Sequence, residues 1–162
     1  MTYDVIVIGA GPAGLSFAKA LSDSDLRVLV IEQNDETDIQ SPPYDGREIA
    51  LTHSSRTIMQ SLSQWDAIDQ QQIGFIKEAK VSSGNAPLTL DFDSQESGLD
   101  CLGFMVSNQN IRRACFAAVE SEPNVDFCFG QSVQSVKTTD NLAQVTLDDD
   151  QTLSTQLVVA AD

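Results

Sequence analysis

The sequence has few basic residues: 9 Lys and Arg stand against 24 Asp and Glu, so the formal net charge is −15. Proteins that bind nucleic acids need clustered cations to neutralise the phosphates, so this charge excludes phosphate-backbone binding as the main function. The same charge disfavours electrostatic attachment to an anionic membrane surface. Nucleic acid and anionic membrane surfaces are therefore not expected as partners.

The sequence also lacks a long hydrophobic run. Its longest stretch without a charged residue, Val5–Ala18, has 14 residues and is interrupted by glycines and a proline. A membrane-spanning helix needs about 20 apolar residues, so no transmembrane segment is expected. The N-terminus has no cationic segment of the kind that opens a secretory signal peptide. These features predict a cytoplasmic protein, with peripheral attachment to a membrane left open as an alternative.

Histidine and cysteine are scarce. His53 is the only histidine, and the cysteines include no Cys-x-x-Cys pair, so a zinc site is not expected. Buried thiols in a reducing compartment explain the cysteines better than a disulfide does. The acidic runs do not have the spacing of a calcium-binding loop and are interpreted as solvated surface. The cysteines are Cys101, Cys115 and Cys128, and the acidic runs are 35–38, 91–96 and 148–150.

Hydrophobic patterning predicts a single α/β domain. Runs rich in Val and Ile at 3–8 and 26–32 have the pattern of strands buried on both faces, and the segment 12–23 between them has the pattern of a helix. Strand, glycine turn, helix and strand within about 30 residues form a βαβ unit. Strands at 125–129 and 156–161 should complete a parallel sheet, with a helix at 108–120 beside it.

The remaining segments predict mainly antiparallel strands and loops. Together with the βαβ unit they indicate a Rossmann-like fold with an appended antiparallel β-meander. The expected elements are a loop at 33–46, a helix from Ser54 or Ser55 to Ile68 with Ile58 on its apolar face, a hairpin of 78–83 and 88–92 around Gly84-Asn85, and a meander of 133–138, 143–147 and 152–161.

A Gly-x-Gly-x-x-Gly motif lies between the first strand and the first helix, where it has functional meaning. Gly9 permits the tight turn, Gly11 lets a pyrophosphate approach the backbone, and Gly14 lets helix and strand pack closely. Pro12 and Ala13 open the helix, whose first amides and dipole favour phosphate. The motif predicts a dinucleotide-binding site.

Glu32 ends the second predicted strand, 18 positions after Gly14, and Gln33 follows it. An acidic side chain at the carboxyl end of this strand can accept hydrogen bonds from ribose hydroxyls. We therefore include Glu32 and Gln33 in the candidate cofactor site. The glycine motif alone does not distinguish FAD from NAD.

Several motifs in the same order resemble the aromatic-ring hydroxylases of ubiquinone biosynthesis, which are FAD-dependent monooxygenases related to para-hydroxybenzoate hydroxylase. These motifs are the glycine turn with Ala18, Leu21 and Glu32, the segment 45–51, the segment 102–108 and the closing segment 157–162. One position departs from the family pattern, because Asp25 stands where a glycine usually precedes the second strand. The turn at Asp25 should therefore be rebuilt locally.

The resemblance implies roles for four further residues. Arg47 would lie over the FAD pyrophosphate, the alternative being a solvated loop arginine. Asn108 would contact the ribityl or phosphate region, or would simply cap the following helix. Val133 would read the adenine through its backbone, a role that is compatible with a place in the core. Asp162 would be the aspartate of the Asp-Gly motif that braces the cofactor cleft.

The resemblance further implies an enzyme that uses FAD, NAD(P)H and O₂ to hydroxylate a polyprenylated phenol or quinol. We expect residues 1–162 to be an FAD-binding domain that is the front part of a longer enzyme, with parts of a substrate-domain insertion near 70–105. Other proteins of the ubiquinone pathway and a second copy of the chain are further expected partners. No catalytic acid or base is assigned, since His53 fits a surface position better.

Two other classes of function stay open on the sequence. One is an NAD-dependent dehydrogenase of the Rossmann type, which the meander before the closing strand and the segment around Arg47 disfavour. The other is a nucleotide-binding module without redox chemistry of its own.

Overall fold

The structure, a computed structural model, describes residues 3–82, 84, 89–96 and 98–161. The chain divides into two compact units. The first contains Met1–Pro43 and Ile111–Asp162, and the second contains Tyr44–Asn110. Within the described residues, no helix is long and apolar enough to cross a membrane.

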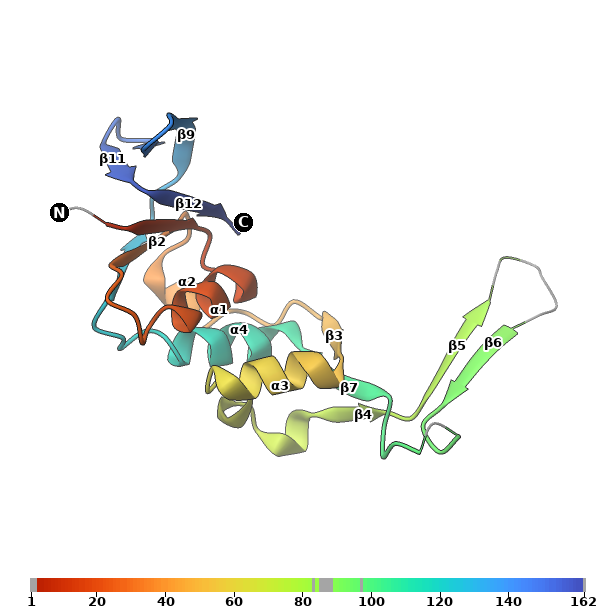
Figure 1. Cartoon of the computed structure of the whole chain (residues 1–162). Helices are drawn as coiled ribbons and strands as arrows, with labels where there is room; N and C mark the ends of the chain where they lie inside the picture. The colour runs from red at the N-terminus through yellow and green to blue at the C-terminus, as the bar shows by residue number, and fades with distance from the viewer. Residues whose placement is uncertain (1–2, 83, 85–88, 97, 162) are drawn as a thin grey trace. The chain divides into compact units, whose positions relative to one another are not determined.

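A parallel sheet forms the centre of the first unit, as the sequence predicts (Figure 1). The order of its strands is β12-β1-β2-β8, and each neighbouring pair is parallel. The strands β1, β2 and β12 consist largely of Val, Ile and Leu, as expected for a sheet that is covered on both faces. The bounds of the strands are β1 Val5–Ile8, β2 Val28–Glu32, β8 Val125–Phe129 and β12 Leu157–Ala160.

Helices cover one face of this sheet. The helix α1 (Pro12–Ala20) packs against β1 and β2, and within it Leu15 and Ala18 are fully buried. The helix α4 (Asn108–Ala117) enters the first unit at Ile111, where the ring of Phe116 lies 5.7 Å from that of Phe127 on β8. The predicted helix at 108–120 is thus confirmed, but it ends sooner.

A three-stranded antiparallel meander covers the other face. Its strands are β9 (Val133–Thr138), β10 (Ala143–Leu147) and β11 (Thr152–Thr155). Buried side chains from the sheet and the meander form one apolar cluster, so the meander belongs to the core of this unit. The cluster consists of Ile6, Leu29, Ile31, Val145 and Leu147.

Two chain turns in the first unit differ from the sequence prediction. The segment 152–161 is divided at Gln156: β11 belongs to the meander and β12 to the parallel sheet. Thr155 stabilises this change of sheet, because its buried hydroxyl donates to Asp4 O at 2.8 Å.

Asp25, at the turn before β2, does not adopt positive φ. Instead, the Asn124 side chain donates to the carbonyls of Leu21 and Leu26 at 3.0 and 2.9 Å and so stabilises the rebuilt turn.

The loop predicted at 33–46 is only partly correct, since it contains the short helix α2 (Glu36–Gln40). This helix is polar and has no repeating pattern of apolar residues, since its single buried side chain is Ile39. Acidic residues in its first turn favour the helix through the dipole.

The second unit contains an antiparallel sheet of order β3-β7-β4, in which β7 (Gly103–Ser107) is the central strand. The strands β3 (Glu48–Leu51) and β4 (Gly74–Ile76) are short. Trp65 and Phe104 pack edge to face at 5.1 Å between ring centroids in the core of this unit. The guanidinium of Arg56 lies 5.4 Å from the Trp65 ring and stabilises the pair through a cation–π contact.

The predicted helix from Ser54 or Ser55 to Ile68 has other bounds. The helix α3 (His53–Ser61) begins after Thr52, whose hydroxyl accepts the Ser55 N–H at 3.1 Å. The helix ends because Ser63 takes a left-handed conformation. Ile58, predicted on the apolar face, is 58% exposed, and Met59 is buried in its place. The 3₁₀ helices η1 (Trp65–Ala67) and η2 (Gln70–Gln72) follow.

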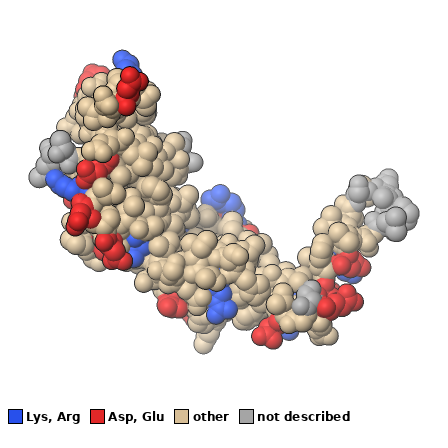
Figure 2. All heavy atoms as spheres, in the orientation of Figure 1, with Lys and Arg blue, Asp and Glu red and all other residues tan. Residues whose placement is uncertain are grey.

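The predicted hairpin is confirmed as β5 (Glu78–Ser82) paired antiparallel with β6 (Thr89–Asp93). Asn85, in its predicted turn, lies outside the described residues. Pairing places Val81 opposite Leu90 on one face and Lys80 opposite Asp91 on the other. Figure 2 shows acidic side chains gathered along this part of the second unit.

Candidate nucleotide-binding site

The glycine turn joins β1 to α1 with the geometry that the motif predicts. Gly9 has φ +102°, a conformation that L-residues with a Cβ rarely adopt, and its N–H donates to Ile31 O at 2.8 Å. A Cβ on Gly14 would lie 2.1 Å from Gly9 O and 3.2 Å from Val7 Cγ1. Gly9 and Gly14 are therefore required by the fold itself.

Gly11 is different, because the surrounding protein does not require a glycine there. Its φ of −75° suits any residue, and a Cβ would lie 3.8 Å from the nearest atom, Ala161 O. Position 11 lies at the N-terminus of α1, where a Cβ would make only ordinary van der Waals contact and where the first amides have no partner within the helix. Gly11 has no side chain to cap them. An anion such as a pyrophosphate fits this position, since it can accept these N–H groups.

Glu32 links the glycine turn to the loop after β2. Its side chain is buried, and Oε2 accepts the Ala10 N–H at 2.7 Å. Oε1 accepts the backbone N–H of Asn34 at 2.9 Å and the Asn34 side-chain amide at 2.6 Å. The carboxylate predicted to bind ribose thus lies directly beside the turn predicted to bind phosphate.

Two other candidate residues belong to the first unit. Gln33 is exposed next to Glu32. Val133 opens β9 and packs, partly buried, against the apolar cluster between sheet and meander. A core role for Val133 is therefore observed, while the adenine contact remains a prediction. Asp162 lies outside the described residues.

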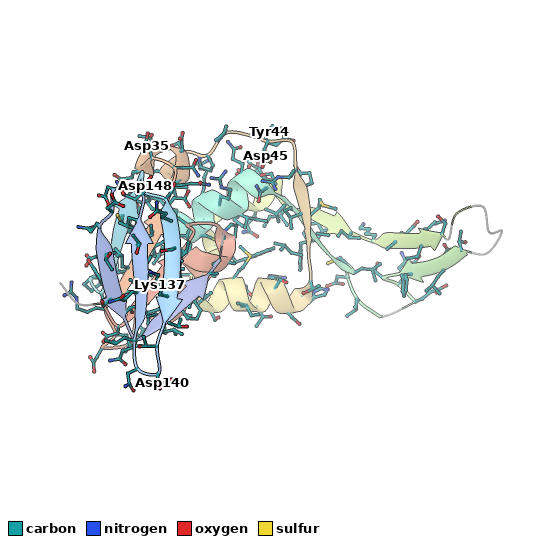
Figure 3. All side chains as sticks on the ribbon, turned by 90° about the horizontal axis from the view of Figure 1, so that it is seen from above. Asp35, Tyr44, Asp45, Lys137, Asp140 and Asp148 are labelled. Atoms are coloured by element: carbon teal, nitrogen blue, oxygen red, sulfur yellow. The ribbon has the colours of Figure 1, made fainter. Side chains whose placement is uncertain are left out.

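Arg47 and Asn108 meet in the second unit at one carboxylate, that of Asp45. Arg47 Nη2 and Nε lie 2.6 and 2.8 Å from Asp45 Oδ2, and the Asn108 side-chain amide donates to the same oxygen at 2.8 Å. The hydrogen bonds from Arg47, followed by that from Asn108, hold the pKa of Asp45 well below its usual range. Figure 3 labels Asp45 and shows it close to the start of α4.

This arrangement fixes the direction of Arg47 while leaving its side chain 65% exposed. The Asn108 N–H also donates to Arg47 O at 2.9 Å, so the two predicted residues are joined through backbone and side chain. The alternative of Asn108 as helix cap is wrong. Asn108 is the first residue of α4, and the Ser107 hydroxyl accepts the Asn110 N–H at 3.3 Å instead.

His53 has a structural role in the second unit. Its Nε2 lies 2.8 Å from the carbonyl oxygen of Cys101 and must donate to it, and its ring packs on the edge of Phe104. The geometry agrees with leaving His53 out of the candidate site.

Comparison with known protein families identifies the domain. The model of the FAD binding domain matches residues 2–162. The chain belongs to this family. The parallel sheet, the glycine turn and the carboxylate at the end of β2 are features of a dinucleotide-binding fold.

Two curated relatives match nearly the whole of this chain. The chain is 47% identical over 163 aligned positions to ubiquinone hydroxylase UbiM of Neisseria meningitidis, covering 98% of this chain and 35% of the relative. It is 26% identical to 3-demethoxyubiquinol 3-hydroxylase of Escherichia coli, covering 98% of this chain and 41% of that protein. The FAD-binding domain described here therefore spans well under half the length of these curated relatives.

The fold also occurs in solved structures. The OxyS anhydrotetracycline hydroxylase from Streptomyces rimosus matches with a TM-score of 0.78 at 16% identity, covering 100% of this chain and 32% of that one. At this identity the match shows the shared fold.

The sequence did not single out the side chains that hold the candidate residues. Asn34 binds Glu32, and Asp45 binds Arg47, in each case across two positions of a loop. An Asx residue near a turn is the available signal, because short polar side chains often bond to groups two residues away. That signal does not specify which partner is chosen.

Proposed function

We propose that this chain is the FAD-binding part of a longer flavoprotein monooxygenase that hydroxylates a polyprenylated phenol or quinol in ubiquinone biosynthesis. Support comes from family membership and from the 47% identity to a protein named ubiquinone hydroxylase. A small aromatic substrate also agrees with the excess of acidic residues, which disfavours polyanionic partners.

In this proposal the first unit holds the ADP half of FAD. The turn 9–14 binds the pyrophosphate through the amides at the start of α1, and Glu32 accepts a ribose hydroxyl. Gln33 and the backbone of Val133 lie toward the adenosine. Arg47 and Asn108, oriented by Asp45, bind phosphate or ribityl oxygens, and Asp162 braces the cofactor cleft.

Bound FAD would supply the redox chemistry of hydroxylation, with NAD(P)H as reductant and O₂ as co-substrate. The residues of this chain bind and orient the cofactor, and none of them is assigned a proton-transfer step. The observation that carries the proposal is the space at Gly11. The surrounding protein would allow a larger residue at position 11, yet the sequence has glycine there. A bound pyrophosphate would need the space that a side chain would fill.

A titration of the chain with ADP and with FAD by calorimetry tests this proposal. We expect the parent to bind both ligands, and Gly11→Val to weaken binding at least about tenfold, equivalent to about 1.4 kcal/mol. Thermal unfolding of Gly11→Val should resemble that of the parent, because the added Cβ would make only an ordinary contact, 3.8 Å from Ala161 O. The control variant Ala117→Val, on an exposed position of α4, should bind normally.

The proposed phosphate site would be wrong if Gly11→Val bound ADP as tightly as the parent. Binding of ADP without binding of FAD by the parent would support a nucleotide-binding module and would contradict the flavin assignment.

A further inference from the structure

The surroundings of Glu32 restrict how it can bind a ribose. A carboxylate offers about four lone-pair positions, two on each oxygen. In the structure Oε1 accepts two hydrogen bonds, both from Asn34, and Oε2 accepts one, from Ala10. The position that these bonds leave for a ligand hydroxyl is therefore on Oε2, the oxygen that lies against the glycine turn.

Asn34 is itself held in place by the residues that follow β8, the strand next to β2. Its carbonyl oxygen accepts the Gly130 N–H at 3.1 Å, and the carbonyl of Glu32 accepts the Gln131 N–H at 3.1 Å. These two bonds tie the loop to the residues that follow β8. The Asn34 amide is thus presented to Glu32 by a fixed backbone, and its 2.6 Å contact with Oε1 does not depend on a freely moving loop.

From this geometry we infer that Asn34 is a positioning residue for ribose recognition, acting through Glu32. The inference rests on the proposed function, since it concerns the same nucleotide site. The two donors of Asn34 occupy Oε1 and leave Oε2 directed toward the glycine turn. The ligand class is a nucleotide with a free ribose diol, from which Glu32 accepts one hydroxyl.

A purely structural role would have different consequences. If Asn34 served only to shape the loop, its loss would weaken all nucleotides alike, whether or not they carry ribose hydroxyls. If it acts through Glu32, the loss of affinity depends on the ribose hydroxyls. These two cases can be separated by the choice of ligand.

The test compares Asn34→Ala with the parent by calorimetry, using ADP and 2′,3′-dideoxy-ADP as probes. We expect ADP affinity to fall about three- to tenfold, the range for one ordinary lost hydrogen bond, and dideoxy-ADP affinity to change less than about twofold. Asn141→Ala, at an exposed turn residue of the meander, is the matched control.

Asn34→Asp provides a second measurement. It places a carboxylate against Oε1, where the two like charges repel, so ADP affinity should fall further than in Asn34→Ala. Equal losses for ADP and dideoxy-ADP in Asn34→Ala would overturn the positioning role. ADP binding by the parent with no effect of either variant would refute this inference alone, whereas a parent that does not bind ADP would refute the proposed function as well.

Discussion

Gly14→Ala perturbs the closest approach of helix and strand in the first unit. The new Cβ would lie 2.1 Å from the carbonyl oxygen of Gly9 and 3.2 Å from Val7 Cγ1. The nearest atom belongs to the backbone and cannot turn away as a side chain would. The start of α1 must therefore shift by about the missing ångström, at a packing cost of about 1–3 kcal/mol or more.

Helix propensity acts in the opposite direction, because alanine in a helix is favoured over glycine by about 1 kcal/mol. Steric overlap dominates, since Gly14 is in the first turn, where the propensity gain is smallest, and its neighbour is rigid. We expect a net loss of about 2 kcal/mol, equivalent to about 4–8 °C in Tm for a chain of this length. Differential scanning calorimetry or thermal circular dichroism measures this shift.

The matched variant is Gly11→Ala, three positions earlier in the same motif. Its Cβ would lie 3.8 Å from the nearest atom, so Tm should change by less than about 1–2 °C. The two variants together separate the fold requirement from the ligand requirement of the motif. A Gly14→Ala chain as stable as Gly11→Ala would refute the packing argument.

Two further predictions concern pH and salt. Burial raises the pKa of the Cys115 thiol from 9.0 to about 11, against a weaker lowering by Ser16. The unfolded chain therefore releases this proton first, and the unfolding free energy should fall between about pH 9 and 11, a loss that Cys115→Ala reduces in denaturant titrations. The net charge of −15 predicts that Tm rises as salt screens repulsion between low and moderate ionic strength, and a Tm that falls steadily instead would show that local ion pairs dominate.

The parallel sheet and the glycine turn were predictable because their signals are local and strong. β1 and β2 are buried on both faces, which gives continuous Val and Ile runs, and the motif between them contains glycines at fixed spacing. The short strands β3 and β4 were missed because three or four residues carry too little periodicity to distinguish a strand from a loop.

The sequence identifies the residues that would face the ligand, but not the side chains that hold those residues in place. Glu32 could be found from its distance to the glycine motif. Asn34 and Asp45 could not, because each acts through a hydrogen bond whose existence depends on a loop conformation. The bond between Asn108 and Asp45 joins residues 63 positions apart and depends on the pairing of β3 with β7. Such contacts follow from the tertiary fold and not from local pattern.

In the proposed site, the turn at 9–14 and Glu32 together bind the nucleotide half of FAD. A ¹H–¹⁵N correlation spectrum of the labelled chain during titration with ADP tests this binding. We expect the largest shifts at the amides of Ala10, Gly11, Ala13 and Gly14, which lie at the glycine turn and the start of α1. Saturable ADP binding that leaves these amides unshifted and moves resonances elsewhere would contradict the proposed site.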